Sequence, residues 1–351
     1  MNKKQLLIYG VIAAILAALV YSQVRTFRHF DWATFWSQTD QVSGFHLLHA
    51  VALIYITYVL RALRWKIFLR PSRPDAKLGS VVGPTVIGFT GLALLGRPGE
   101  LIRPYLIARR NNLSFPSQLG VWAVERIFDI GAFTILLVLT TFVATAPKRL
   151  AAYAAFQKAG LAFALLSVGL TIAAIAVHRS GDALARWAQR RLSGRLEHLG
   201  QRLATRIREF RSGLNAIHGP GSFFALLGVS LLLWCMIAIA YKEVTHAYGV
   251  EELEIPQTQV LLLMGSSMVG SIIQLPGVGG GSQLATIAVL RHIFEVPEEL
   301  AASCGIMLWL VTFVAVIPLG LILAHREHLS LRKLSQESHT AEQSEGTVAS
   351  G

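Results

Sequence analysis

Two hydrophobic segments of this chain are interrupted by glycine and proline, and this feature constrains the fold more than any other. Residues 88–103 read GFTGLALLGRPGELIR, and residues 274–283 read QLPGVGGGSQ. A broken backbone leaves N–H and C=O groups that hydrocarbon cannot satisfy, so such segments occur in membranes only where protein covers them or a polar cavity wets them. A facing pair of interrupted segments is typical of transporters. These two segments are therefore the first place to look for a function.

The composition is that of a membrane protein. Of the 351 residues, 53% are hydrophobic and 15% are charged, whereas soluble domains contain about 25% charged residues. A helix needs about 20 apolar residues to cross about 30 Å of hydrocarbon. The apolar segments lie at roughly 5–22, 44–62, 78–96, 117–146, 156–177, 221–245, 258–294 and 299–324. We predict an all-α polytopic membrane protein with one membrane domain over 1–325, an uncleaved first helix at 5–22 and a polar, disordered tail at 326–351.

The net charge of +12 is best explained by membrane orientation. Lysine and arginine lie in short loops beside apolar segments, which favours contact with anionic headgroups over nucleic acid binding. Segments 61–77 and 178–219 are basic, and we place them on the cytoplasmic side with both termini. Segment 178–219 also has a loose helical period of apolar residues. This pattern predicts one or two amphipathic helices on an anionic leaflet, or alternatively a solvated basic connector.

The distribution of charge assigns the two interrupted segments to opposite faces of the membrane. Segment 97–117 carries four arginines, so the positive-inside rule holds only if 78–96 begins and ends in the cytoplasm as a re-entrant hairpin of short helices. Segment 258–294 begins and ends at acidic loops, which predicts a hairpin that enters from outside. The result is about six full transmembrane helices plus two re-entrant hairpins. Segments 44–62, 78–96 and 117–146 would match 221–245, 258–294 and 299–324 as an inverted repeat.

The first hairpin ends in a charged motif that contains Arg97, Glu100 and Arg103. Ionised groups near membrane depth are costly unless they are paired or functional. The two arginines are candidates to hold a lipid phosphate, with Glu100 orienting them or contacting a cationic headgroup. The alternative is an ion pair that pins the hairpin at the interface.

A second charged motif, Glu125, Arg126 and Asp129, lies inside the apolar segment 117–146. Glu125 and Asp129 are four residues apart and share one helix face. Three ionisable groups in one span predict a polar cavity or internal pairing. We expect a salt bridge to an arginine of the first hairpin, and a role in binding substrate or protons stays open beside it.

The turn of the second hairpin offers mainly backbone, with Gly277, Gly279, Gly280 and Gln283 as candidate binding residues. Glycine allows close approach of a ligand to backbone N–H groups; the alternative is a tight turn and nothing more. The residues that close segment 44–62, which are Arg61, Arg64, Trp65 and Lys66, are interpreted as interfacial anchors in preference to ligand-binding residues.

No catalytic or metal-binding grouping is evident in the sequence. His46 and His49 share a helix face without a third ligand in view, and no Ser/His/Asp or Cys/His grouping supports nucleophilic catalysis. We therefore assign no catalytic residue, no metal and no cofactor.

Taken in series, these motifs resemble the transmembrane domain of the lysylphosphatidylglycerol synthase family, whose members are flippase-like integral membrane proteins. The resemblance rests on Arg64-Trp65, the motif 97–103, the motif 125–129 and the turn 275–280. This sequence departs from the family pattern at Gly91, Leu95 and Gln283, where the family usually has Asn, Pro and Glu. The chain has no room for the soluble aminoacyltransferase domain of the full synthases, so that activity is not implied.

The resemblance implies a flippase that moves an anionic, zwitterionic or polyprenyl-linked lipid across the bacterial cytoplasmic membrane. Its partners would be phosphate-bearing membrane lipids. One alternative is a membrane enzyme that modifies a lipid with Glu100, Glu125 or Asp129 as general base. Another is an accessory subunit of a glycosyltransferase or lipid synthase, and a homo-oligomer is left open.

Overall fold

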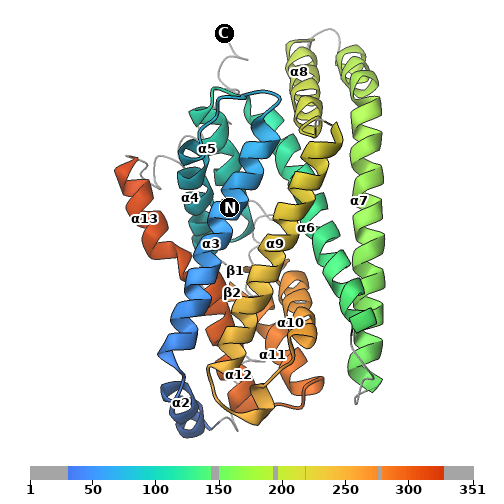
Figure 1. Cartoon of the computed structure of the whole chain (residues 1–351). Helices are drawn as coiled ribbons and strands as arrows, with labels where there is room; N and C mark the ends of the chain where they lie inside the picture. Colours follow the sequence, from blue (N-terminus) through green and yellow to red (C-terminus); the bar gives the residue numbers. More distant parts are fainter. Residues whose placement is uncertain are drawn as a thin grey trace, which may run out of the picture.

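The computed structural model describes residues 31–143, 150–192, 197–217, 219–272, 274–275 and 279–327. The predicted first span at 5–22 lies outside these ranges, as do residues 328–351 of the predicted tail. The described residues form a bundle of helices, which confirms the all-α fold class, with one pair of two-residue strands at its centre (Figure 1). The largest apolar core lies between α3, α9, α10 and α12, whose bounds are given next.

The elements follow one another along the chain with short connections. They are α2 (Trp32–Asp40), α3 (Gly44–Leu69), α4 (Gly79–Leu95), η2 (Arg97–Leu101), α5 (Ile102–Arg110), α6 (Phe115–Val143), α7 (Leu150–Arg191), α8 (Glu197–Leu214), α9 (Gly219–His246), η3 (Glu251–Leu253), α10 (Gln257–Gly270), β1 (Gln274–Leu275), β2 (Gly279–Gly280), α11 (Gly281–His292), α12 (Glu298–Trp309), the π-helical segment η4 (Leu310–Val314) and α13 (Val316–Arg326).

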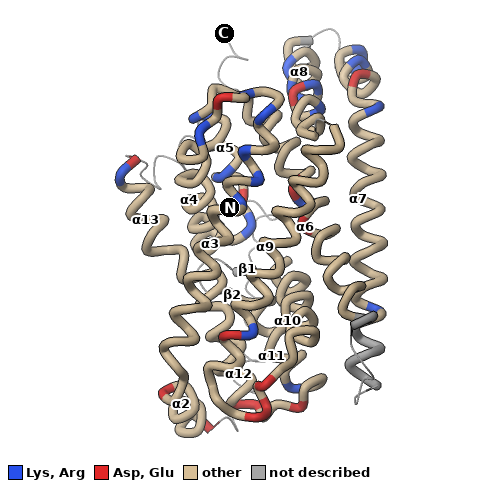
Figure 2. Tube along the Cα trace, viewed as in Figure 1, with Lys and Arg blue, Asp and Glu red and all other residues tan. Residues whose placement is uncertain are grey.

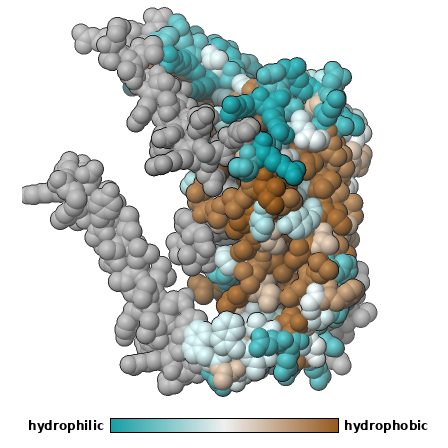
Figure 3. Space-filling view, turned by 90° about the vertical axis from the view of Figure 1, so that its left-hand side faces the viewer, coloured by the Kyte–Doolittle hydropathy of each residue, from teal (hydrophilic) through white to brown (hydrophobic). Residues whose placement is uncertain are grey.

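Four helical segments in the described part of the chain are long and apolar enough to cross a membrane. They are α3, residues 157–191 of α7, α9, and the unit from α12 to α13. Helix α6 has 29 residues, but it carries the charged motif 125–129. The distribution of hydropathy on the surface is that expected of a membrane protein, because a hydrophobic band separates hydrophilic regions at the two ends of the bundle (Figure 3).

The two ends of the bundle differ in charge (Figure 2). Lysine and arginine gather at the end where α4 and α6 begin and where α8 lies, and aspartate and glutamate gather at the opposite end, near α2 and η3. This separation matches the basic and acidic loops that the sequence predicts.

The first hairpin is longer than the predicted range 78–96. Helix α4 is continuous through Pro84, and the chain reverses at Gly96 (φ 69°) and returns through η2 and α5. The prediction of short helices within 78–96 is therefore wrong, because most glycines here serve close packing and not chain reversal. A Cβ on Gly88 would lie 2.9 Å from the Cα of Arg103, and one on Gly99 would overlap the carbonyl of Gly91. Because these positions are glycine, the backbone of α4 lies directly against the backbones of η2 and α5.

The second hairpin matches the predicted range 258–294 and its central break. Helices α10 and α11 pack against each other, and a Cβ on Gly270 would overlap the carbonyl group of Gly281. Between them β1 and β2 pair antiparallel, with Gln274 opposite Gly280. In Figure 1 the α4–α5 hairpin occupies the upper half of the bundle and the α10–α11 hairpin the lower half. Arg97 of the first donates from Nε to the carbonyl of Ser271 in the second at 3.0 Å.

The basic segment 178–219 contains the predicted pair of helices, in an arrangement that the sequence did not suggest. Helix α7 continues without a break to Arg191, and α8 folds back beside it along the axis of the bundle instead of extending flat across its end (Figure 1). Helix α8 also packs on α6, where a Cβ on Gly213 would overlap the carbonyl of Ser117. The segment is helical, and both the contact with an anionic leaflet and the alternative of a solvated basic connector stay predictions.

Candidate functional site

A buried ion cluster joins α3, α5, α6 and α9 near the basic half of the bundle. Arg64 is at its centre and is fully buried. Its guanidinium donates to Glu125 Oε1 at 2.5 Å, to Asp129 Oδ1 at 2.7 Å and to Ser230 Oγ at 2.9 Å. Because Glu125 and Asp129 are four residues apart on α6, one arginine from α3 reaches both. Buried charges are expected to be paired in this way.

Arg103 of α5 connects the first hairpin to this cluster. It donates to Glu125 Oε1 at 3.0 Å and also to Oε2, so the pair is bidentate. Its guanidinium lies 4.5 Å from the ring centroid of Trp65, within the range of a cation–π interaction. The predicted salt bridge between α6 and an arginine of the first hairpin is confirmed.

The prediction that residues 61–66 are interfacial anchors is wrong for most of them. Arg64 and Trp65 are completely buried and Arg61 is 9% exposed. Helix α3 extends to Leu69, and Arg64 forms ion pairs with the carboxylates of Glu125 and Asp129 on α6 inside the protein. Trp65 donates its indole N–H to Gln118 at 3.2 Å.

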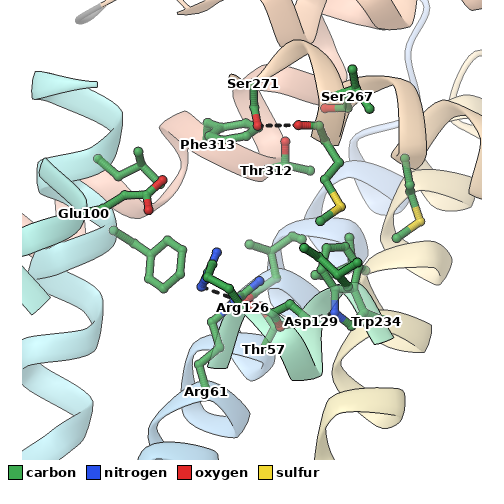
Figure 4. A pocket seen from close by; sticks show the side chains of 18 of the residues that line it. Thr57, Arg61, Glu100, Arg126, Asp129, Trp234, Ser267, Ser271, Thr312 and Phe313 are labelled. Carbon is green, nitrogen blue, oxygen red and sulfur yellow. Dashed lines mark hydrogen bonds and ion pairs between the residues drawn. The ribbon is translucent and has the colours of Figure 1, made fainter. Parts of the chain in front are cut away.

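A cavity of about 340 Å³ lies beside the ion cluster, between the two hairpins. Apolar side chains form most of its wall, among them Phe89, Phe163 and Met264. Its polar lining comes from Thr57, Arg61, Arg97, Glu100, Arg126, Asp129, Trp234, Ser267, Ser271 and Thr312. Figure 4 shows Arg61, Arg126 and Asp129 together on one side of it, with Ser267, Ser271 and Thr312 on the other.

Arg61 is the unusual residue of this cavity. Its guanidinium lies 4.8 Å from the ring centroid of Phe89, and its Nε has no hydrogen-bond partner within the described part of the chain. No carboxylate of the described residues lies within ion-pair distance of it, whereas Arg64 and Arg126 both have such partners. A buried cation without a local partner is costly, so this position favours the entry of an anion.

The charges around the cavity leave an excess of positive charge. Arg61, Arg64, Arg103 and Arg126 face only two carboxylates, Glu125 and Asp129, so four charges minus two leave two positive charges. At the mouth of the first hairpin Arg97 and Glu100 form an ion pair with each other and add no net charge. The site is therefore suited to an anionic group.

The predicted binding residues lie in three places, which are the cavity, the ion cluster behind it and the glycine-rich turn. Arg97, Glu100, Arg126 and Asp129 line the cavity. Arg103 and Glu125 lie behind it in the ion cluster, where they support α6.

The glycine-rich turn does not share this position. Among the described residues Gly280 and Gln283 do not line the cavity, and the Gln283 side chain instead accepts a hydrogen bond from the Gly280 amide at 3.1 Å. Gly279 belongs to β2, and Gly277 lies outside the described residues. The second hairpin contributes α10 residues to the cavity, Ser267 and Ser271 among them.

Sequence reasoning missed Arg61, Arg64 and Trp234 as parts of the site. The signal for the two arginines was present, since they are three residues apart on one helix face, as are Arg126 and Asp129 on α6. The position of these two arginines at the end of an apolar segment favoured their interpretation as interfacial anchors instead. Trp234, which donates to Asp129 at 3.3 Å, is an unremarkable residue in an apolar run and gave no signal.

His46 and His49 both contact Glu243 at the other end of the bundle. Their Nδ1 atoms lie 2.5 and 3.3 Å from the carboxylate oxygens of Glu243 on α9. In the part of the chain that the structure describes, no group of three or more His, Cys, Asp or Glu side chains is arranged to hold a metal ion.

Comparison with known proteins assigns the family. The family model described as the lysylphosphatidylglycerol synthase TM region matches residues 6–320. The chain belongs to this family. It is therefore a multi-pass membrane protein, in agreement with its apolar helices.

Two curated proteins are similar to the chain. A UPF0104 membrane protein from Methanothermobacter thermautotrophicus is 27% identical over 288 residues, which are 79% of this chain and 82% of that protein. Glycosyltransferase AglD from Haloferax volcanii is 28% identical over 233 residues, which are 58% of this chain and only 36% of that protein. No solved structure matches.

Proposed function

We propose that this protein moves a phosphate-bearing lipid across the membrane and binds the headgroup in the cavity between the two hairpins. The observation that carries the proposal is Arg61, a buried guanidinium that lines the cavity and has no carboxylate partner among the described residues. A phosphate oxygen is the natural acceptor for a guanidinium because the fork of N–H donors matches it in geometry.

The rest of the cavity suits a headgroup. Arg126 lies beside Arg61 and adds a second cation, while the hydroxyl groups of Ser267, Ser271 and Thr312 offer hydrogen bonds from the other side (Figure 4). The volume of about 340 Å³ falls within the range of about 300–1,000 Å³ that is usual for small-molecule sites. The apolar remainder of the wall would accept the start of the acyl or polyprenyl chains.

The two hairpins give a route for alternating access. We take them as re-entrant elements of an inverted repeat that contains six spans, including the predicted helix at 5–22. Within the described residues, Arg97 and Ser271 link the tips of the two hairpins through the Nε bond at 3.0 Å and an Nη2 bond to the hydroxyl at 3.2 Å. This link is weak enough to break and reform as the halves rock.

The orientation follows from the charge of the two ends. The basic end would face the cytoplasm, with both termini on that side, and the acidic end would face outward (Figure 2). In a bacterial cell the membrane would be the cytoplasmic membrane. Anionic lipids of the inner leaflet would then meet the basic end.

A general-base role in lipid modification is less well supported. The oxygens of Glu125 and Asp129 are engaged by arginines, and Glu100 pairs with Arg97. A carboxylate that already accepts from guanidinium groups is a poor acceptor for a substrate proton.

An accessory role beside a glycosyltransferase is the second candidate. The observation in its favour is the similarity to glycosyltransferase AglD, whose length extends well beyond the matched region. In that case the cavity would hold a phosphate-linked glycolipid, and the protein would hand it to a partner enzyme. Co-purification that depends on 178–219 would support this candidate.

Transport is tested in proteoliposomes with fluorescent phosphatidylglycerol and leaflet-selective quenching. The wild-type protein should equilibrate the probe faster than empty liposomes, and Arg61→Gln should slow it about 10- to 100-fold, the factor for one charge-assisted hydrogen bond. Arg70→Gln is the matched control, because Arg70 is an exposed arginine at the end of the same helix. Equal rates with and without protein would exclude translocation of this lipid, and an Arg61→Gln protein at the wild-type rate would remove the assigned site.

A further inference from the structure

A second and larger cavity lies on the other side of α6, away from the charged one. Its volume is about 500 Å³, and it is bounded by α6, α7, the end of α8 and the start of α9. From α6 it takes Ile127, Phe128 and Gly131, whereas the charged cavity takes Arg126, Asp129 and Ile130. Both cavities are lined by residues of α6, α7 and α9, but they have no lining residue in common, and we call the second one the α6–α7 groove.

Small side chains create the groove. Gly131, Ala132, Ser167 and Ala174 line it where α6 and α7 pass each other. A Cβ added to Gly131 would lie 3.5 Å from Ser167 Oγ, an ordinary contact distance. The helices are thus close at this point, and the space beside it is left open by the small residues instead of being filled by leucine or phenylalanine.

The groove is continuous with the lipid-facing surface. Several of its apolar residues are exposed, among them Ile135, Ile175 and Phe223, at 37%, 47% and 42%. Two of the bounding helices, α7 and α9, contain segments apolar enough to span the membrane. An apolar groove at this depth meets hydrocarbon and not water, so its occupant is a chain of a membrane lipid.

One end of the groove is polar and lies next to positive charge. His178 and Asn215 line that end, and His178 Nδ1 is buried without a hydrogen-bond partner in the described residues. Arg211 donates from Nε to the carbonyl of His178 at 2.7 Å and is ion-paired with Asp182, whereas Arg179 follows His178 in sequence with its side chain exposed. A buried imidazole nitrogen without a partner calls for a ligand oxygen.

We propose that the α6–α7 groove binds an anionic glycerophospholipid as a resident ligand. One acyl chain lies between α6 and α7, the ester or phosphate oxygens accept from His178, and the negative charge lies toward Arg179. This site goes beyond the proposed translocation, since it needs neither Arg61 nor movement of the hairpins. The lipid contacts the opposite face of the helix that carries the ion cluster.

The test is photolabelling in nanodiscs of phosphatidylcholine that contain a small fraction of phosphatidylglycerol with a diazirine in one acyl chain. Labelled peptides should map to 127–135 and 167–178. Ala174→Phe should lower that labelling at least about fivefold, which corresponds to about 1 kcal/mol of binding. Ala176→Phe is the matched control, because Ala176 is an exposed α7 residue that does not line the groove.

Two further measurements keep the proposal falsifiable. His178→Leu should lower the preference for phosphatidylglycerol over phosphatidylcholine about two- to tenfold, the factor for one hydrogen bond. If Ala174→Phe does not fold, Ser167→Leu fills the same groove from about two turns earlier in α7. Labelling unchanged by either groove variant, or equal labelling by a diazirine phosphatidylcholine, would overturn the proposal. Because the readout is occupancy and not lipid movement, failure of translocation would leave this result interpretable.

Discussion

The buried ion cluster makes a sharp prediction about stability, because its two signs of charge are not equivalent. The paired arginines Arg64, Arg103 and Arg126 and the neighbouring Arg61 outnumber two carboxylates, so the cluster together with Arg61 has an excess of two positive charges. Removing one partner of a buried ion pair costs about 3–5 kcal/mol. The stability loss for each substitution within that range depends on whether the substitution lowers or raises the excess of positive charge.

Arg64→Met removes three hydrogen bonds but relieves the charge excess. The lost bonds run to Glu125, Asp129 and Ser230 at 2.5–2.9 Å, and after the change the excess falls from two charges to one. Glu125 keeps Arg103 as a partner, and Asp129 keeps its contact with Arg126. We therefore expect a loss near the lower limit, about 3 kcal/mol.

Glu125→Gln has the opposite effect on the balance. It leaves Arg64 and Arg103 without their shared carboxylate and raises the excess from two charges to three. Both guanidinium groups are almost completely buried, so bulk solvent does not compensate their charge. We expect a loss of about 5 kcal/mol, and thus a larger loss than for Arg64→Met even though the side chain changes less in size.

The assay is equilibrium unfolding of the purified protein in mixed micelles of a mild detergent and dodecyl sulfate. Arg70→Met is the control, since Arg70 is exposed at the end of the same helix, and it should change stability by less than about 0.5 kcal/mol. The double variant Arg64→Met with Asp129→Asn should lose less than the sum of the single changes. If Glu125→Gln proves no more damaging than Arg64→Met, the reasoning from excess charge is refuted.

Three further predictions address packing, hydrogen bonding and pH. Gly99→Ala should cost more than about 1 kcal/mol, because a Cβ there overlaps the carbonyl of Gly91, whereas Gly44→Ala should be close to neutral in the same unfolding assay. Trp234→Phe should cost about 1 kcal/mol through loss of the 3.3 Å bond to Asp129. At the start of α2 the Thr34 hydroxyl and backbone lower the pKa of Asp31 below 3.8, so its contribution is present above that value and is lost as the pH falls through the lowered pKa. Protection of the Thr34 amide from exchange, relative to its intrinsic exchange rate, should fall as the pH drops below about 4 in the wild type but should show no such change in Asp31→Ala.

Much of the architecture could be read from sequence because membrane insertion leaves a strong pattern of apolar segments and charged ends. The reversal of polarity between the two hairpins followed from the basic and acidic loops alone, and the structure places the hairpins in opposite halves of the bundle (Figure 1). The details of chain reversal did not follow. Glycines at 88, 91 and 99 mark close approach of two limbs, and sequence alone cannot distinguish that role from a turn.

The candidate site was predicted only in part, for a similar reason. The motif on α6 predicted a salt bridge because ionised groups within a span need partners, and the partner was found in the first hairpin. Arg61 and Arg64 stand at the end of an apolar segment, where arginine is usually an interfacial anchor. Only the packing of α3 against α6 and α9 shows that this end of the helix is inside the protein.

The division between the cluster and the cavity separates structural charges from charges available to a ligand. Arg64 and Arg103 have their donors committed to carboxylates, so their loss should reduce stability and transport together. Arg61 has no such commitment among the described residues, and its loss should slow transport while leaving the unfolding free energy unchanged or raised. A buried, unpaired cation is a cost that the folded protein bears without its ligand. A rise in stability for Arg61→Gln, together with slower lipid movement, would therefore be the clearest indication that this arginine is kept for binding.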